Sequence, residues 1–183
     1  LSGLHDVNAA EIAGAMRDLP GWPGMASLQR NLERALWREG AGKNEILATF
    51  ASQMPKTAEG VSLLANAYLN NGDTQSARKL LSPYWRTTKL DEWSERLILD
   101  DFSSVLTPED HLIRMQAMLY AERLNSAARV AELGGGKELH AAWVAVFRGD
   151  KNAKKLLEAV PKEQQVHSGY LFSRLLAARK ARD

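Results

Sequence analysis

Four histidines have the widest chemical repertoire in this sequence: His5, His111, His140 and His167. A neutral imidazole can bind a metal ion or act as a general base, but a metal site on one helix needs two ligands three or four positions apart. No two of these histidines have that spacing, and the chain has no cysteine to supply a thiolate. We therefore predict no metal site and no catalytic histidine, and we expect His111 to form a hydrogen bond with the backbone or with a neighbouring carboxylate.

Carboxylates are the second group that could carry chemistry, because glycan cleavage uses paired acids. A catalytic acid needs a raised pKa in a cleft, whereas acidic residues at helix starts and on polar helix faces are expected for other reasons. We assign the most suggestive acids to such structural positions: Glu92, Asp100, Asp101, Glu109 and Asp110.

Two glycine-rich segments end in a lysine, residues 40–43 and residues 134–137. A phosphate-binding loop requires the GxxxxGK spacing, a Ser or Thr after the lysine and a preceding strand. Neither segment has any of these features, so we predict that both connect helices. No pattern in the chain predicts a cofactor.

The overall charge limits the classes of partner. The 183 residues include 24 Lys and Arg and 22 Asp and Glu, a net charge of +2, and the basic residues are spread along the chain. This balance does not predict a nucleic-acid surface, and no apolar run is long enough to span a membrane. We assign the basic residues near the C-terminus to the solvent-exposed face and the C-terminal dipole of a last helix: Arg174, Arg179, Lys180 and Arg182.

The elements that must position these side chains are helices. Val61, Leu64, Ala65, Tyr68 and Leu69 recur at the spacing of one face of an α-helix, and no stretch alternates as a strand would. Three other segments repeat this spacing: 28–36, 139–147 and 153–160. The sequence therefore predicts an all-α fold.

Capping residues mark where several helices begin and end. Thr107 followed by Pro108 is typical of a helix start, and Thr57 has the same role before the helix that contains Val61. Gly72-Asp73 ends one helix and caps the next, and we expect residues 149–150 to do the same. Such turns are typical of αα-hairpins.

A weak internal repeat supports an array of these hairpins. Residues 72–77, 123–128 and 149–154 align, with a small fifth residue each time (Ser76, Ala127, Ala153) that allows two helices to approach closely. We predict an irregular α-α superhelix of stacked, tetratricopeptide-like hairpins. Its paired helices are 22–39 with 43–54, 57–71 with 73–83, 107–121 with 124–133, and 137–148 with 151–160. Helices near 6–18, 90–102 and 163–181 join or end the array.

Large aromatic side chains are expected between the layers, because a single hairpin cannot bury its apolar face alone. We predict that four tryptophans have this role: Trp37, Trp85, Trp93 and Trp143.

Residues 102–114, Phe-Ser-Ser-Val-Leu-Thr-Pro-Glu-Asp-His-Leu-Ile-Arg, and the Leu119-Tyr120 that follows resemble a segment of the soluble lytic murein transglycosylases. In that family the segment belongs to the superhelical region that precedes the catalytic domain. The resemblance continues through Arg148-Gly149-Asp150-Lys151-Asn152-Ala153 and Val160-Pro161. It is strongest over residues 104–183 and weaker over 1–103, so the whole chain, 1–183, is interpreted as one superhelical region.

The resemblance implies a periplasmic parent enzyme that cleaves peptidoglycan strands to 1,6-anhydromuramyl products. Its catalytic glutamate lies in a Glu-Ser pair within a lysozyme-like domain, followed by Gly-Leu-Met-Gln. This chain contains neither motif. The lytic domain is therefore expected to be absent, the chain is expected to be a piece of a longer protein, and no catalytic residue carries over. The expected role is a scaffold that helps to hold or guide the glycan strand and binds peptidoglycan weakly.

A different class of function remains open on the repeat pattern alone. Tetratricopeptide-like arrays commonly bind a peptide or a partner protein, so a stand-alone interaction adaptor is the alternative. Dimerisation through an apolar terminal layer is also open, because an end hairpin has no neighbour to cover it.

Overall fold

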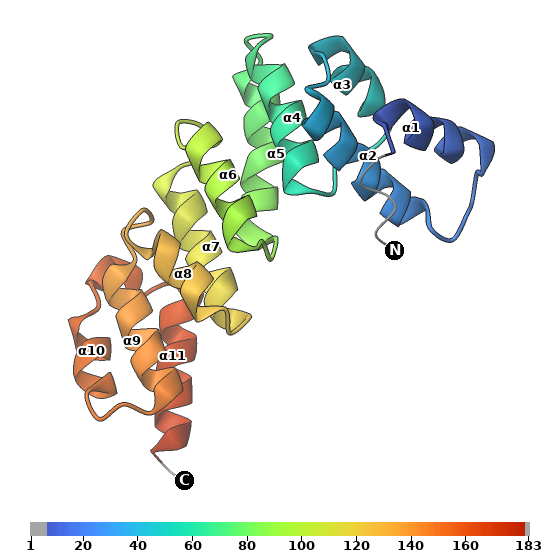
Figure 1. Cartoon of the computed structure of the whole chain (residues 1–183). Helices are drawn as coiled ribbons and strands as arrows, with labels where there is room; N and C mark the ends of the chain where they lie inside the picture. The colour runs from blue at the N-terminus through green and yellow to red at the C-terminus, as the bar shows by residue number, and fades with distance from the viewer. Residues whose placement is uncertain (1–6, 182–183) are drawn as a thin grey trace. The chain divides into compact units, whose positions relative to one another are not determined.

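The computed structural model describes residues 7–181, and within this range it contains α-helices, one short 3₁₀ helix and no strand (Figure 1). The all-α prediction is confirmed. The α-helices are α1 (Ala9–Asp18), α2 (Met25–Glu39), α3 (Lys43–Thr49), α4 (Ala58–Leu69), α5 (Thr74–Thr87), α6 (Glu92–Phe102), α7 (Pro108–Tyr120), α8 (Leu124–Ala131), α9 (Lys137–Arg148), α10 (Ala153–Ala159) and α11 (Ser168–Lys180). His5 and Arg182, which the sequence analysis considered, lie outside the described residues.

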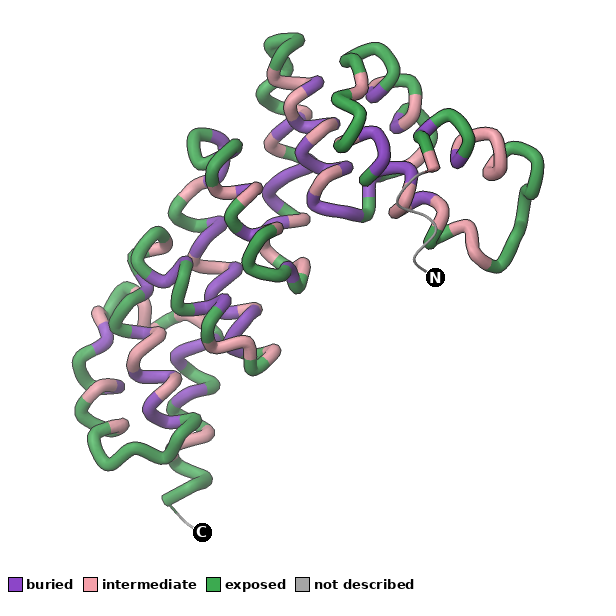
Figure 2. Tube along the Cα trace, viewed as in Figure 1, coloured by how far each residue is buried: buried purple, intermediate pink, exposed green. Residues whose placement is uncertain are grey.

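The helices form two compact units. The described part of the first consists of residues 7–81 and 90–105, and that of the second consists of residues 82–89 and 106–181. Helix α5 contributes to both, and Pro83 lies inside it just beyond the point of division. The sequence predicted that this helix would end at residue 83, but it continues for one more turn to Thr87. Each unit has buried residues on the inner faces of its helices (Figure 2).

The predicted caps are largely confirmed. Thr107 Oγ1 accepts a hydrogen bond from the Asp110 N–H, and Thr57 Oγ1 accepts one from the Gly60 N–H. Gly149 ends α9 with φ +77°, a conformation that glycine adopts without steric cost. Asp150 does not cap α10, however, because residues 151 and 152 form a turn and the helix begins only at Ala153.

In the first unit, one cluster of buried residues joins α1 and α2 through Ile12, Leu32 and Leu36. Helix α2 packs against α1 and α4, and α3 packs against α4. The predicted pairing of residues 22–39 with 43–54 is therefore wrong. Helix α3 has only seven residues, too few to cover the apolar face of α2, so α1 and α4 cover it instead.

In the second unit, α7 pairs with α8 and α9 pairs with α10, as predicted, and α11 packs against α9 and α10. Trp85 and Trp143 are buried at the centres of their layers, which confirms two of the predicted fillers. Trp37 is only partly buried. Trp93 is 53% exposed, so its prediction is wrong: the buried face of α6 carries Ile98 and Phe102, and Trp93 lies on the opposite side of that helix.

Candidate functional site

A buried polar network holds the first turn of helix α7 in the second unit. The Asp110 carboxylate accepts hydrogen bonds from Thr107 N and Oγ1, both at 2.8 Å, and pairs with Arg86 Nε at 2.7 Å. Burial favours the neutral form of Asp110, but these hydrogen bonds and the Arg86 charge together outweigh it, so the pKa of Asp110 lies below its ordinary value. Asp110 lies in the first turn of α7, which confirms its assignment to a helix start, and its side chain is fully buried there.

The next turn of α7 is held by Trp85. The indole Nε1 of Trp85 donates to His111 Nδ1 at 3.2 Å, and the Arg114 guanidinium lies over the Trp85 ring, 4.1 Å from its centroid. Arg114 also donates to the carbonyl oxygens of Trp85 and Thr88. The expected partner of His111, a backbone group or a carboxylate, is replaced by the indole of Trp85, which lies on α5.

The histidines that the structure describes do not form a catalytic or metal-binding group. Burial lowers the pKa of both His111 and His140, so both imidazoles are neutral at pH 7. His140 Nε2 is buried and has no hydrogen-bond partner among the described residues. No three His, Asp or Glu side chains of residues 7–181 lie close enough together to hold a metal ion.

The remaining predicted site residues lie apart from one another. Glu92 starts α6 and pairs with Arg96 at 3.4 Å on the surface. Asp100 and Asp101 lie near the end of α6 and are largely exposed. The partial burial of the Asp101 carboxyl group and the neighbouring Asp100 charge raise the pKa of Asp101. The two glycine-lysine segments connect α2 to α3 and α8 to α9, as predicted.

The basic residues near the C-terminus have two different settings. Lys180 donates from Nζ to the carbonyl oxygens of Val146 at 3.1 Å and Phe147 at 2.7 Å, so it caps the end of the neighbouring helix α9 rather than its own helix. Arg174 and Arg179 are exposed on α11, as expected.

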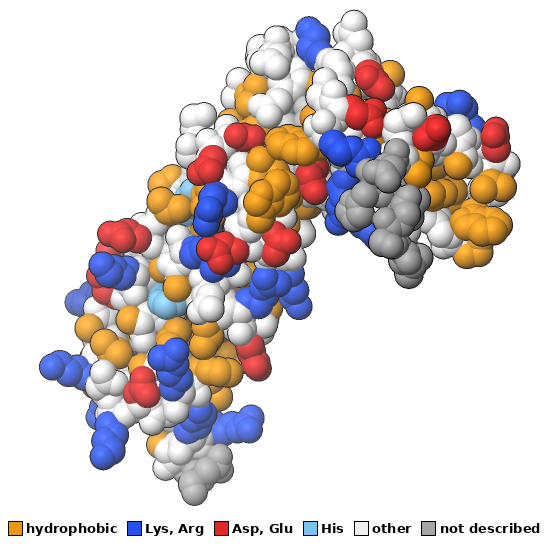
Figure 3. All heavy atoms as spheres, in the orientation of Figure 1, with side chains coloured by type: hydrophobic (Ala, Val, Ile, Leu, Met, Phe, Trp, Pro, Cys, Tyr) orange, Lys and Arg blue, Asp and Glu red, His pale blue; other side chains and the backbone are white. Residues whose placement is uncertain are grey.

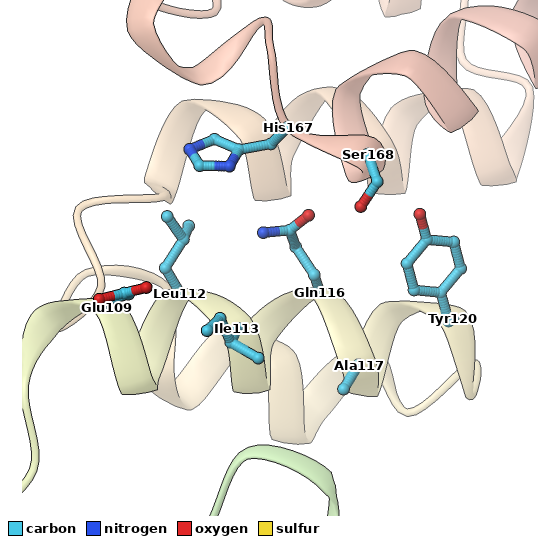
Figure 4. A pocket seen from close by; sticks show the side chains of 8 residues that line it. All are labelled: Glu109, Leu112, Ile113, Gln116, Ala117, Tyr120, His167 and Ser168. Atoms are coloured by element: carbon cyan, nitrogen blue, oxygen red, sulfur yellow. The ribbon is translucent and has the colours of Figure 1, made fainter. Parts of the chain in front are cut away.

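One pocket lies between α7 and the start of α11, and it is the candidate binding site (Figure 4). Its volume is about 400 Å³. It is lined by Glu109, Leu112, Ile113, Gln116, Ala117, Tyr120, His167 and Ser168. Two residues considered from the sequence, Glu109 and His167, therefore line the same pocket. No hydrogen bond joins them within the described residues.

The polar centre of this pocket is Gln116. Its Oε1 accepts a hydrogen bond from the Gly169 N–H at 3.1 Å, which fixes the side-chain amide across the pocket. A Cβ at residue 169 would lie 2.6 Å from both Gln116 Oε1 and Trp143 Cζ3, so only glycine allows α11 to approach this closely. The Gln116 Nε2 group has no partner among the described residues and remains available as a donor.

An aromatic side chain closes one end of the pocket. The Tyr120 ring is 47% exposed, and it packs edge-on against Trp143, with centroids 4.7 Å apart, and against Phe172, with centroids 5.2 Å apart. These contacts hold the ring in one orientation at one end of the pocket, and the apolar side chain of Leu112 lies toward the other end (Figure 4).

A close approach of backbones also positions α7. A Cβ at Gly134, in the α8–α9 connector, would lie 2.5 Å from the Leu112 backbone nitrogen. The glycine-rich segment 134–136 therefore brings this connector against the turn of α7 that lines the pocket, which is a packing role and not a phosphate-binding one.

The arrangement suits binding better than catalysis. His167 and Ser168 point in different directions (Figure 4), and no hydrogen bond joins them within the described structure, so they are not arranged as a base and its nucleophile. The pocket instead combines one exposed aromatic ring, an apolar floor and several hydrogen-bonding groups. Sequence reasoning missed Gln116 and Tyr120, because only the packing of α11 against α7 makes a pocket of them.

The chain matches no protein-family model, and neither a curated protein nor a solved structure is significantly similar to it. Among the described helices, none has the length and apolar character needed to cross a membrane.

Proposed function

We propose that this chain is the helical scaffold region of a periplasmic soluble lytic transglycosylase, and that the pocket beside α7 binds the glycan strand of peptidoglycan. The sequence resemblance supports the family, because its most specific part, residues 102–114, runs into the first turns of α7 and includes Thr107, Asp110, His111 and Arg114 of the buried network. The single observation that carries the binding role is the chemistry of the pocket.

Sugar rings have apolar C–H faces and a polar rim of hydroxyl groups, so their binding sites combine an aromatic surface with hydrogen-bonding side chains. Tyr120 offers an exposed ring of fixed orientation, Gln116 and Ser168 offer hydrogen-bonding groups between it and the middle of the pocket, and Glu109 lies at the opposite end (Figure 4). An N-acetyl group adds a methyl group and an amide, for which the apolar floor and the free Gln116 amide are complementary. The expected ligand is therefore an N-acetylated glycan that is bound without being cleaved.

Isothermal titration of the chain with soluble peptidoglycan fragments tests this proposal. Tyr120→Ala should weaken binding by about fivefold, which corresponds to the loss of about 1 kcal/mol of ring contact. Trp93→Ala is the matched control, because Trp93 is also an exposed aromatic residue but lies in the other unit. An equal loss in both variants, or no binding by the parent chain, would rule out the pocket as the site.

Incubation with purified sacculi tests the absence of catalysis. We expect association with the sacculi and no release of anhydromuropeptides, since the chain lacks the Glu-Ser and Gly-Leu-Met-Gln motifs of the family. Release by the chain alone would contradict the scaffold role. Tyr120-dependent binding of unmodified peptides, with no binding of glycan fragments, would instead support the interaction adaptor.

A further inference from the structure

A second pocket lies in the second unit, between α10 and α11. Its volume is about 440 Å³, and it shares no lining residue with the first. It is lined by Lys154, Leu157, Glu158, Gln165, Tyr170 and Arg174. Four of these six residues can donate hydrogen bonds from their side chains.

The surroundings of this pocket are basic. Residues 148–181 contain eight Lys and Arg against three Asp and Glu, a net charge of +5, whereas the whole chain carries only +2. Figure 3 shows several Lys and Arg side chains around this end of the chain. The basic residues were expected to be spread along the chain, but they are concentrated in this part of it. An anionic ligand is therefore drawn toward this part of the surface.

The two cations in the pocket are not paired within the protein. Neither Lys154 nor Arg174 has an ion pair or a hydrogen bond with another described residue, although Glu158 lines the same pocket. Lys180 differs from them, since it is used to cap α9. The charges of Lys154 and Arg174 are thus available to a ligand.

Other contacts give the pocket a defined shape. The Tyr170 ring is 6% exposed, and the Arg174 guanidinium lies 6.0 Å from its centroid. Gln165 Nε2 donates to the Val160 carbonyl oxygen at 2.8 Å, which anchors that side chain to the end of α10.

We propose that this pocket binds a carboxylate-bearing peptide, with the carboxylate between Lys154 and Arg174. A guanidinium presents parallel N–H groups that match the two oxygens of a carboxylate. Glu158 supplies an acceptor for a peptide N–H in the same pocket. A peptide offers a singly charged carboxylate and several N–H donors, whereas inorganic phosphate carries more negative charge at physiological pH and is repelled more strongly by Glu158. This inference does not depend on the glycan proposal, because it concerns a different pocket.

Titration with the tetrapeptide Ala-Glu-Ala-Ala, followed by amide chemical shifts of the isotope-labelled chain, tests the proposal. We expect saturable shifts centred on residues 154–174. Lys154→Gln and Arg174→Gln should each weaken binding about threefold to tenfold, the range expected for one charge-assisted hydrogen bond at an accessible site. Both side chains are exposed, so neither change is expected to unfold the unit.

Lys155→Gln is the matched control, because it removes the same charge from the adjacent exposed position, which does not line the pocket. An equal loss with Lys155→Gln would show diffuse attraction and overturn the proposal, as would equally strong binding of inorganic phosphate at the same residues or an absence of shifts. Tyr120→Ala should leave this binding unchanged, so the result is separate from the outcome at the glycan pocket.

Discussion

A buried carboxylate in the first unit allows a quantitative test of the packing of α2 against α4. The side chain of Glu33, on α2, is fully buried. Its oxygens accept hydrogen bonds from Lys56 N at 2.9 Å, from Thr57 N and Oγ1, both at 2.7 Å, and from Gln29 Nε2 at 3.1 Å. One side chain therefore satisfies the donors that precede α4.

Replacing Glu33 with alanine leaves the N–H groups of Lys56 and Thr57 without acceptors. An unsatisfied buried donor costs about 1–3 kcal/mol, so Glu33→Ala should lower the free energy of unfolding of the first unit by about 4 kcal/mol. Glu45→Ala is the matched control, because Glu45 is exposed on α3, and this change should alter stability by less than about 0.5 kcal/mol.

Gly60 provides the second arm of the test. A Cβ at this position would lie 2.4 Å from Glu33 Oε2 and 2.7 Å from Glu33 Cδ, so Gly60→Ala must displace the carboxylate from its hydrogen bonds. In the parent chain we expect a loss of about 2–3 kcal/mol, despite the better helix propensity of alanine. In the Glu33→Ala background the steric conflict is absent, and Gly60→Ala should be neutral or stabilising by up to about 1 kcal/mol.

Urea denaturation followed by circular dichroism gives the four stabilities of this double-mutant cycle. Hydrogen exchange of the α4 amides assigns the change to the first unit, with about a thousandfold loss of protection expected for 4 kcal/mol. The predicted coupling energy is about 2–4 kcal/mol. Effects that add to within about 0.5 kcal/mol would refute the direct contact between Gly60 and Glu33.

Three further changes test the second unit. Trp143→Ala should cost about 3–5 kcal/mol in urea denaturation because it empties the space of a fully buried ring; an unchanged midpoint would contradict this packing. The pKa of Asp110 is lower in the folded state than in the unfolded state, so the carboxylate contributes to stability above about pH 4. This contribution is lost as the pH falls through the folded-state pKa. In unfolding free energies measured over a pH series, Asp110→Asn should remove this loss at acid pH. The folded-state pKa of His111 is lowered, so the unfolded chain takes up its proton first and stability should fall as the pH drops below about 6.5; a slope unchanged in His111→Gln would exclude this contribution.

Local signals predicted most of the helices correctly. Helix α7 begins at Pro108 because Thr107 and Asp110 satisfy its first donors, and α9 ends at Gly149 because that residue adopts a positive φ. Both are interactions between near neighbours in the chain. The partner of α2 was not predictable in this way, because the apolar spacing of a helix shows which face is buried and does not show what covers it.

The candidate pocket depends on longer-range information. Gln116 and Tyr120 lie on α7, and His167 and Ser168 come about 50 positions later in the chain. Their proximity follows from the close packing of Gly169 against Gln116 and Trp143, where no residue with a Cβ fits. The only sequence signal was a glycine in the first turn of a helix, where its low helix propensity requires an explanation such as close packing.

The same reasoning separates structural carboxylates from catalytic ones. An acid that protonates a glycosidic oxygen must be neutral at its working pH, so its site must raise its pKa. Asp110 is buried as such an acid would be, but Thr107 and Arg86 hold its charged form and lower its pKa. Glu33 is also enclosed by hydrogen-bond donors, the N–H and Oγ1 of Thr57. These two buried acids therefore stabilise helix starts, and the ligand binding that we propose is assigned to other places in the second unit, the pocket beside α7 and the pocket between α10 and α11.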